Sequence, residues 1–274
     1  MLRTVTLLGF LTGILLLVGY LIAGIEGMTF FLFIASLMNF LSYWYSDKIV
    51  LGMYKAKEIK ESQNPELHKI VGNLAKKAKI PKPRLYLVNL NVPNSFATGR
   101  SPKHSAIAVT TGLLNNLNEK EIEGVLSHEI GHIKNHDILT STIAATIGGA
   151  IAYIAQIAWW SLFLGERRQG NVVLLPLLIL APFAATLVRL AISRTREYKA
   201  DYTGAVITKK PLYLASALEK ISKITKKHPL VGNTATSHLW IVNPFKSDMF
   251  ANLFNTHPPV EKRVERLKIL AKNL

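Results

Sequence analysis

Apolar residues along the chain collect in four long runs, separated by segments rich in charged residues. The runs are Thr4–Ala23, Met28–Tyr45, Ile138–Trp160 and Val172–Ile192. A helix needs roughly 20 apolar residues to cross a bilayer, and each run has about that length with few or no charges. A buried core helix could explain one such run, but four together predict transmembrane helices. The short segment Gly24–Gly27 fits a tight turn between the first two spans.

The first run has one alternative explanation, a secretory signal peptide, because Arg3 precedes it. It is long for the apolar part of such a peptide, Leu21 and Ala23 make a poor cleavage site, and a second apolar run follows at once. We therefore expect it to be retained as a transmembrane span.

The segment between the second and third runs reads as a folded domain. Asn64 and Pro65 are typical of an N-cap and first helical position, and they predict a helix to about Lys79. The alternation in "PKPRLYLVNL" predicts a strand at about Arg84–Leu90, and "NSFATG" and "SAIAVTTG" predict two further short strands. The predicted fold is therefore a mainly α membrane protein with an α+β domain that contains a small β-sheet.

Charge indicates the orientation in the membrane. Nearly all of the 33 Lys and Arg residues, which give the chain a net charge of +16, lie in residues 46–137 and 193–274. The loop at 161–171 carries only Arg167 and Arg168. Because basic residues favour the cytoplasmic side, both basic segments, both termini and any site on them are predicted to be cytoplasmic.

This orientation divides the chain into a transmembrane hairpin at 4–45, a cytoplasmic part at 46–137, a second hairpin at 138–192 and a second cytoplasmic part at 193–274. The chain has no cysteine, which excludes disulfides, thiol catalysis and cysteine-ligated metals. A nucleic-acid partner is not expected, since no nucleic-acid motif accompanies the basic charge. The protein is expected to lie in the cell membrane and to cross it several times.

A metal-binding pattern lies directly before the third apolar run. Asn118 and Glu121 have the spacing of a capping box and open a helix that contains His128-Glu129-Ile130-Gly131-His132. In this H-E-x-x-H pattern the two histidines share one helix face and can bind one zinc ion at ~2.1 Å. Glu129 lies beside the metal and can take a proton from water. The alternative is an exposed polar helix face.

A catalytic zinc ion needs a third protein ligand. His136 is too far from His128 along a helix, by ~12 Å, to share one ion. Glu197 in "RTREYKAD" is the better candidate. If the flanking spans continue as helices, His132 lies ~9 Å before the third span and Glu197 ~8 Å after the fourth, at one depth. Asp201, one helical turn after Glu197, can accept a hydrogen bond from a ligand histidine.

These features together resemble the HtpX-type membrane zinc proteases, which are relatives of the CAAX prenyl proteases. The resemblance rests on "NSFATG", "LSHEIGHIKNHDIL", "REYKAD", "TSHLWIVNP" and "THPPVEKRVERL", in this order along nearly the whole chain. It implies a zincin-like (gluzincin) domain, one zinc ion per chain, and a cytoplasmic active site. By resemblance, His128, His132 and Glu197 are the zinc ligands and Glu129 is the catalytic acid/base.

The resemblance also implies residues that contact substrate. Asn94–Gly99 resembles an edge strand along which a substrate peptide adds as a further strand, so Asn94, Ser95, Phe96 and Ala97 are predicted to bind substrate. The family commonly has Ala where this chain has Ser95. His257 and Arg263 lie in the "THPPVEKRVERL" match, and either could stabilise the oxyanion. For His257, a position at a helix start is the simpler explanation.

The predicted function is that of a membrane-bound zinc endopeptidase which degrades misfolded or damaged membrane proteins. Its partners would be membrane-protein or unfolded polypeptide substrates and the lipid bilayer. Two alternatives remain: a CAAX-type processing protease, and a catalytically inactive zinc-containing membrane scaffold. A transporter is disfavoured because the predicted spans hold almost no ionisable groups.

Overall fold

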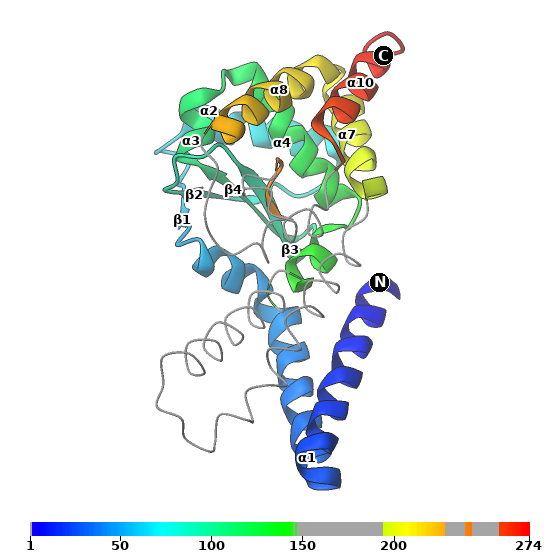
Figure 1. Ribbon diagram of the computed structural model, residues 1–274. Coiled ribbons are helices and arrows are strands. Elements are labelled where there is room, and N and C mark those ends of the chain that lie inside the picture. Colours follow the sequence, from blue (N-terminus) through cyan, green and yellow to red (C-terminus); the bar gives the residue numbers. More distant parts are fainter. Residues whose placement is uncertain (1, 145, 147–193, 228–238, 243–257) are drawn as a thin grey trace.

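A computed structural model describes residues 2–144, 146, 194–227, 239–242 and 258–274. In it a long helical hairpin stands below an α+β domain (Figure 1). The third predicted span from residue 147 onward, the loop at 161–171, the fourth span and His257 lie outside the described residues.

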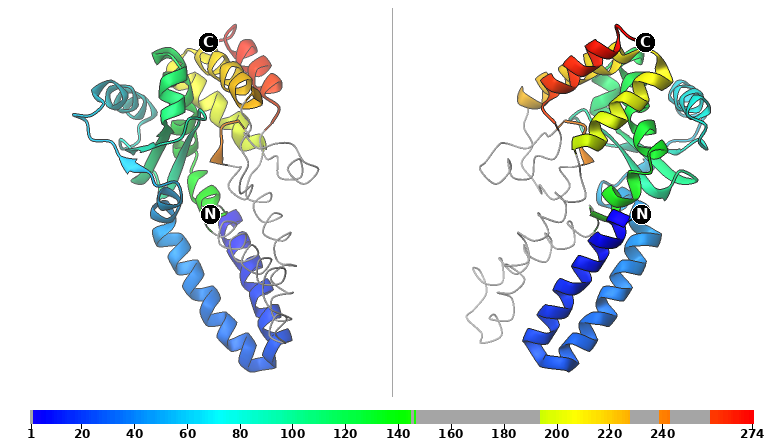
Figure 2. Two further views of the ribbon diagram at one scale, coloured as in Figure 1. Left: turned by 60° about the vertical axis from the view of Figure 1, so that its left-hand side comes forward. Right: turned by 90° about the vertical axis from the view of Figure 1, so that its right-hand side faces the viewer.

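The hairpin is formed by α1 (Leu2–Met53), in which two helices meet at Ala23 and Gly24. Gly24 has φ 59 and ψ −139, a conformation that suits glycine because it has no Cβ. Within the described residues, Leu8–Met53 is the one helix long and apolar enough to cross a membrane, and 11% of its most apolar window is buried in protein. Figure 2 shows its two legs side by side.

Two details of this hairpin differ from the prediction. The turn falls at Ala23–Gly24, slightly before the predicted Gly24–Gly27. The second leg also continues past Tyr45 to Met53, because Val50 and Leu51 at its end are buried against the domain. The boundary between membrane hairpin and domain is therefore a continuous helix and not a break at residue 46.

The sheet has four strands in the order β1-β2-β4-β3. They are β1 (Lys57–Glu58), β2 (Arg84–Val88), β3 (Ser95–Ser101) and β4 (His104–Thr110). β2 and β4 are parallel, whereas β3 is antiparallel to β4 and forms one edge of the sheet. The three strands predicted from alternation are confirmed, and "NSFATG" occupies an edge as expected.

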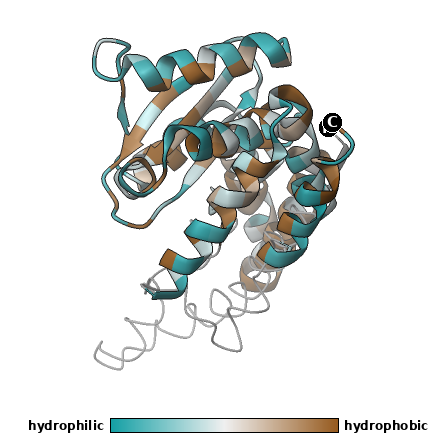
Figure 3. Cartoon of the chain, turned by 90° about the horizontal axis from the view of Figure 1, so that it is seen from above, coloured by the Kyte–Doolittle hydropathy of each residue, from teal (hydrophilic) through white to brown (hydrophobic). Residues whose placement is uncertain are grey.

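The helices of the domain are α2 (Pro65–Ala78), α3 (Thr111–Asn116), α4 (Glu119–Lys134), α7 (Arg194–Thr208), α8 (Pro211–Lys227) and α10 (Val260–Leu270). Asn64 caps α2 through Leu67 N, and Asn118 and Glu121 form both bonds of a capping box at α4, so both predicted helix starts are confirmed. Seen from above, these helices carry hydrophilic and hydrophobic residues interspersed along their length (Figure 3).

The core forms around α4, which packs against α2, α7, α8 and β3. Its Val125, Leu126, Ile130 and Ile133 are fully buried. The sequence suggested that α4 would run straight into the next apolar segment, but it does not. It ends at Lys134, His136 has φ 59, and a new helix begins at Ile138. The turn redirects the chain so that Asp137 faces back toward α4.

Candidate metal centre

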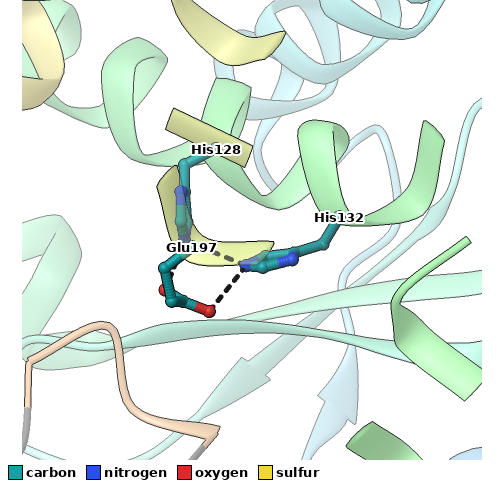
Figure 4. A group of neighbouring side chains, drawn as sticks. All are labelled: His128, His132 and Glu197. Atoms are coloured by element: carbon teal, nitrogen blue, oxygen red, sulfur yellow. Dashed lines mark hydrogen bonds and ion pairs between the residues drawn. The ribbon is translucent and has the colours of Figure 1, made fainter. Parts of the chain in front are cut away.

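Three side chains from two crossing helices converge in the interior of the domain (Figure 4). His128 and His132 lie one turn apart on α4, and Glu197 lies in the first turn of α7. His128 Nε2 and His132 Nε2 are 3.2 Å apart. The two oxygens of Glu197 lie 3.6 Å from His128 Nε2 and 3.4 Å from His132 Nε2.

This geometry fits a zinc ion. A tetrahedral ion with bonds of ~2.1 Å holds its ligand atoms ~3.4 Å apart, which is the spacing of these three groups. Two imidazoles and one carboxylate are also a donor set that catalytic zinc sites use. Among the described residues, these three are the group of His, Asp and Glu side chains close enough together to hold a metal, with ligand atoms within 4.8 Å of one another.

The close crossing of α4 and α7 is what brings Glu197 to the histidines. A Cβ added at Gly131 would lie 2.7 Å from Ala200 O, and one at Gly204 would lie 2.9 Å from the backbone of Ser127. Real Cβ atoms essentially never come within 3.0 Å of such atoms. The two glycines therefore permit a backbone approach that any larger residue would widen.

The Nδ1 atom of each histidine contacts a carboxylate, and that carboxylate contacts an arginine. His128 Nδ1 lies 2.9 Å from Asp201 Oδ1, and Arg263 donates to both oxygens of Asp201 at 2.7 and 2.9 Å. We call His128, Asp201 and Arg263 the inner triad. Burial alone would raise the pKa of Asp201, but Arg263 and His128 outweigh it and lower that pKa to about 2.

The second histidine has a looser version of the same arrangement. His132 Nδ1 lies 3.5 Å from Asp137 Oδ2, and Arg196 Nε lies 3.3 Å from Asp137 Oδ1. We call His132, Asp137 and Arg196 the outer triad. Asp137 lies three residues beyond the end of α4. It faces His132 because the turn at His136 reverses the chain, which helical periodicity does not predict.

The pKa of His132 indicates that metal binding must displace a proton from this side chain. Burial would lower it, but Glu197, Asp137 and Glu129 outweigh burial and raise the pKa of His132 to about 10. Without a metal, the site therefore holds a proton on His132 near neutral pH. Because a metal ligand must be deprotonated, binding releases that proton.

Glu129 lies beside the three ligands, buried, with Ser95 Oγ donating to its Oε1 at 2.6 Å. Sequence reasoning had assigned Ser95 only to the substrate strand and had not paired it with Glu129. Ser95, Phe96 and Ala97 line a cavity of about 40 Å³ together with Glu129 and the three ligand residues. This volume has room for about one to three waters.

Two predicted site residues have contacts that the sequence did not indicate. The Asn94 amide donates to Leu239 O at 3.4 Å and accepts from Ile241 N at 2.9 Å, so it holds the segment 239–242 beside β3. Arg263 has a fully buried side chain engaged with Asp201 and with Ile241 O, at 3.0 Å, and it does not line the cavity. It therefore positions Asp201, and its Nη1 lies 3.9 Å from Glu197 Oε2.

Comparison with known proteins places the chain in context. Residues 61–271 match the model of peptidase family M48. A protease HtpX homolog of Pyrococcus furiosus is 55% identical, over 99% of this chain and 96% of its own length. Homologs of the same name from Thermococcus sibiricus and Persephonella marina are 49% and 50% identical, over 97% and 98% of their lengths.

Among solved structures, the crystal structure of S. mikatae Ste24p superposes with a TM-score of 0.50 at 18% identity. The match covers 95% of this chain and 62% of that one, so the chain spans less than two thirds of its length. At this identity the likeness shows the fold alone.

Proposed function

Because the chain belongs to peptidase family M48 and is a membrane metalloprotease, we propose that it is a zinc endopeptidase acting at the cytoplasmic face of a cell membrane. The observation that carries the zinc assignment is the spacing of the ligand atoms of His128, His132 and Glu197, at 3.2–3.6 Å from one another. When bound there, zinc supplies a Lewis acid that activates water and polarises a carbonyl.

The chain's own residues then carry the proton. Glu129 takes a proton from the attacking water, whose oxygen bonds to the peptide carbonyl carbon. As the C–N bond breaks, Glu129 passes this proton to the leaving amine. The hydrogen bond from Ser95 keeps the Glu129 carboxylate directed at the cavity, and the two triads fix the orientation of the histidine rings.

The substrate class follows from where the site lies. The second leg of α1 ends against the domain, and β3, the edge strand, contacts both α1 and α4. β3 is the last strand of the sheet, and an extended polypeptide can add to such a strand through backbone hydrogen bonds, which do not depend on its sequence. We propose misfolded or damaged membrane proteins as substrates, with quality control as the role.

The test is cleavage of an unfolded reporter protein by the purified full-length protein in detergent. Wild type should cut with zinc and stop with a chelator. Glu129→Gln should bind zinc with wild-type stoichiometry and fail to cut, because the amide cannot accept the proton. If Glu129→Gln cuts as fast as wild type, Glu129 is not the base. If both bind zinc and neither cuts any reporter, an inactive scaffold is the better assignment.

The proposed topology has four spans with both termini and the site in the cytoplasm. The natural chain lacks cysteine, so single-cysteine variants can be labelled without background. Ser161→Cys, in the predicted outer loop, should react with a membrane-impermeant maleimide on intact cells. Lys227→Cys, at the end of α8, should react only after the membrane is opened. The reverse labelling pattern would show that the orientation in the membrane is opposite to the proposed one.

A further inference from the structure

A second pocket, separate from the metal centre, is lined by residues of the second leg of α1, the start of β2 and the β3–β4 hairpin. Figure 1 labels these elements. Its volume of about 680 Å³ is in the range of small-ligand sites. It is lined by Phe40, Trp44, Tyr45, Asp47, Lys48, Lys82, Arg84, Arg100, Lys103, His104 and Ser105. Five of these side chains are cationic and one is anionic, so the pocket is strongly basic.

The positive charge is only partly neutralised. Arg84 Nη2 lies 3.0 Å from Asp47 Oδ2, and Lys82 Nζ lies 3.6 Å from Glu61 Oε2. Lys48, Arg100 and Lys103 make no ion pair with any carboxylate in the part of the chain that the structure describes. Three cations around one concave surface repel one another, and an anion bound among them would relieve that repulsion.

Aromatic side chains on α1 hold two of these cations in place. The Arg100 guanidinium lies 4.6 Å from the centre of the Trp44 ring, and Lys48 Nζ lies 5.4 Å from that of Tyr45. Arg100 Nη1 also lies 3.5 Å from Trp44 O. Stacking of this kind pre-orders an arginine, so less conformational entropy is lost when it binds a ligand.

The position of the pocket along α1 indicates its surroundings. Trp and Tyr are enriched where a transmembrane helix leaves the hydrocarbon, at the level of the lipid headgroups. Trp44 and Tyr45 end the second apolar run, and Lys48 follows one turn later. The turn between β3 and β4 brings Arg100 and Lys103 to the same level, although they are more than 50 residues away in sequence.

We propose that this pocket binds the phosphodiester headgroup of an anionic membrane lipid. Arg100 offers a planar fork that matches two phosphate oxygens, and Lys48 and Lys103 add point charges beside it. The lipid would tie the β3–β4 turn to the membrane and so set the height of the edge strand above it. The inference rests on the proposed placement of α1 in the bilayer and is independent of the peptidase assignment.

The test is binding of short-chain phosphatidylglycerol to the full-length protein in detergent, followed by calorimetry, with short-chain phosphatidylcholine and inorganic phosphate as comparison probes. Phosphatidylglycerol should bind, phosphatidylcholine should bind at least tenfold more weakly, and inorganic phosphate should not displace the lipid. The double variant Lys48→Gln/Lys103→Gln should weaken phosphatidylglycerol binding by about tenfold or more. Arg100→Lys should give an intermediate loss, because lysine lacks the fork.

The matched control is Lys223→Gln/Lys262→Gln, which removes the same charge from exposed positions on α8 and α10 at the far end of the domain (Figures 1 and 2). It should bind like wild type. Equal losses in both double variants, or equal binding of the two lipids, would overturn the proposal, as would full displacement by inorganic phosphate. Glu129→Gln should also bind lipid like wild type, so that a failed protease assignment leaves this result readable.

Discussion

The inner and outer triads each consist of one histidine, one aspartate and one arginine, but they differ in burial and in contact distances. In the inner triad the side chains of His128, Asp201 and Arg263 are 2%, 5% and 0% exposed, and the contacts of His128 and Arg263 with Asp201 are 2.7–2.9 Å long. In the outer triad those of His132, Asp137 and Arg196 are 16%, 10% and 16% exposed, and their contacts are 3.3–3.5 Å long. The inner triad belongs to the core, whereas the outer triad lies at the end of α4.

This difference assigns the two triads different tasks. The inner triad joins α4, α7, α10 and the segment 239–242 through Arg263, so it stabilises the fold as well as orienting His128. The outer triad joins the end of α4, the turn at Asp137 and α7. We expect damage to the inner triad to cost folding stability, and damage to the outer triad to cost metal affinity alone.

The largest effect is expected from Asp201→Asn. It leaves the fully buried charge of Arg263 without its carboxylate, and breaking a buried pair in this way costs about 3–5 kcal/mol. Thermal unfolding of metal-free protein, followed by circular dichroism in detergent, measures the loss. Asp201→Glu, which keeps the charge, should lose less. A wild-type melting temperature for Asp201→Asn would show that the inner triad does not stabilise the fold.

Asp137→Asn is the corresponding change in the outer triad. Zinc affinity should fall by about 10–100-fold, because the ring of His132 loses the acceptor that orients it. The metal-free melting temperature should change less than in Asp201→Asn, since the contacts of Asp137 with Arg196 and His132 are longer, at 3.3 and 3.5 Å. Competition with a fluorescent zinc chelator measures the affinity. The comparison fails if this variant unfolds as readily as Asp201→Asn.

Gly204→Ala should disturb both triads together, since α7 carries Asp201, Arg196 and Glu197. The added Cβ would lie 2.9 Å from the Ser127 backbone, and overpacking of this kind costs about 1–3 kcal/mol. Zinc affinity should fall with stability. Gly72→Ala on α2 is the matched control, because the nearest atom to its Cβ is 4.0 Å away, on the Lys82 side chain. That change should stabilise slightly through helix propensity.

The smallest expected effect is the change of zinc affinity per unit of pH, which arises because a proton and zinc compete for His132. Because the pKa of His132 is raised to about 10, the metal-free site is protonated below that pH, and zinc must displace one proton. Apparent zinc affinity should therefore rise about tenfold per pH unit up to roughly pH 10. The His132 contribution to metal-free stability runs the other way. It is complete below the ordinary histidine pKa of 6.5 and is lost as pH rises through about 10.

Asp137→Asn should narrow the pH range over which zinc affinity rises, because the Asp137 hydrogen bond is one of the causes of the raised pKa of His132. A zinc affinity that does not depend on pH between 7 and 9 in wild type would show that His132 is already neutral there.

Much of the local structure was predictable because its causes are local. The caps at Asn64 and Asn118 act within three residues, alternation in the strands has a period of two, and the two histidines are one helical turn apart. Glu197 was a candidate because it follows the fourth apolar run about as closely as His132 precedes the third, and Asp201 because it lies one turn after Glu197. The hydrogen bonds of Ser95 to Glu129 and of Arg263 to Asp201 span 34 and 62 residues, and no local pattern points to them.

By itself the sequence determined the apolar hairpin, the two capped helices, three of the four strands and the set of residues able to hold a metal ion, since these depend on composition and short spacing. Tertiary structure alone decided how those residues meet. It placed α7 against α4 at a distance set by Gly131 and Gly204, and it reversed the chain at His136 so that Asp137 faces His132. It also buried Arg263 behind His128, because side chains far apart in sequence come into contact only when the core packs.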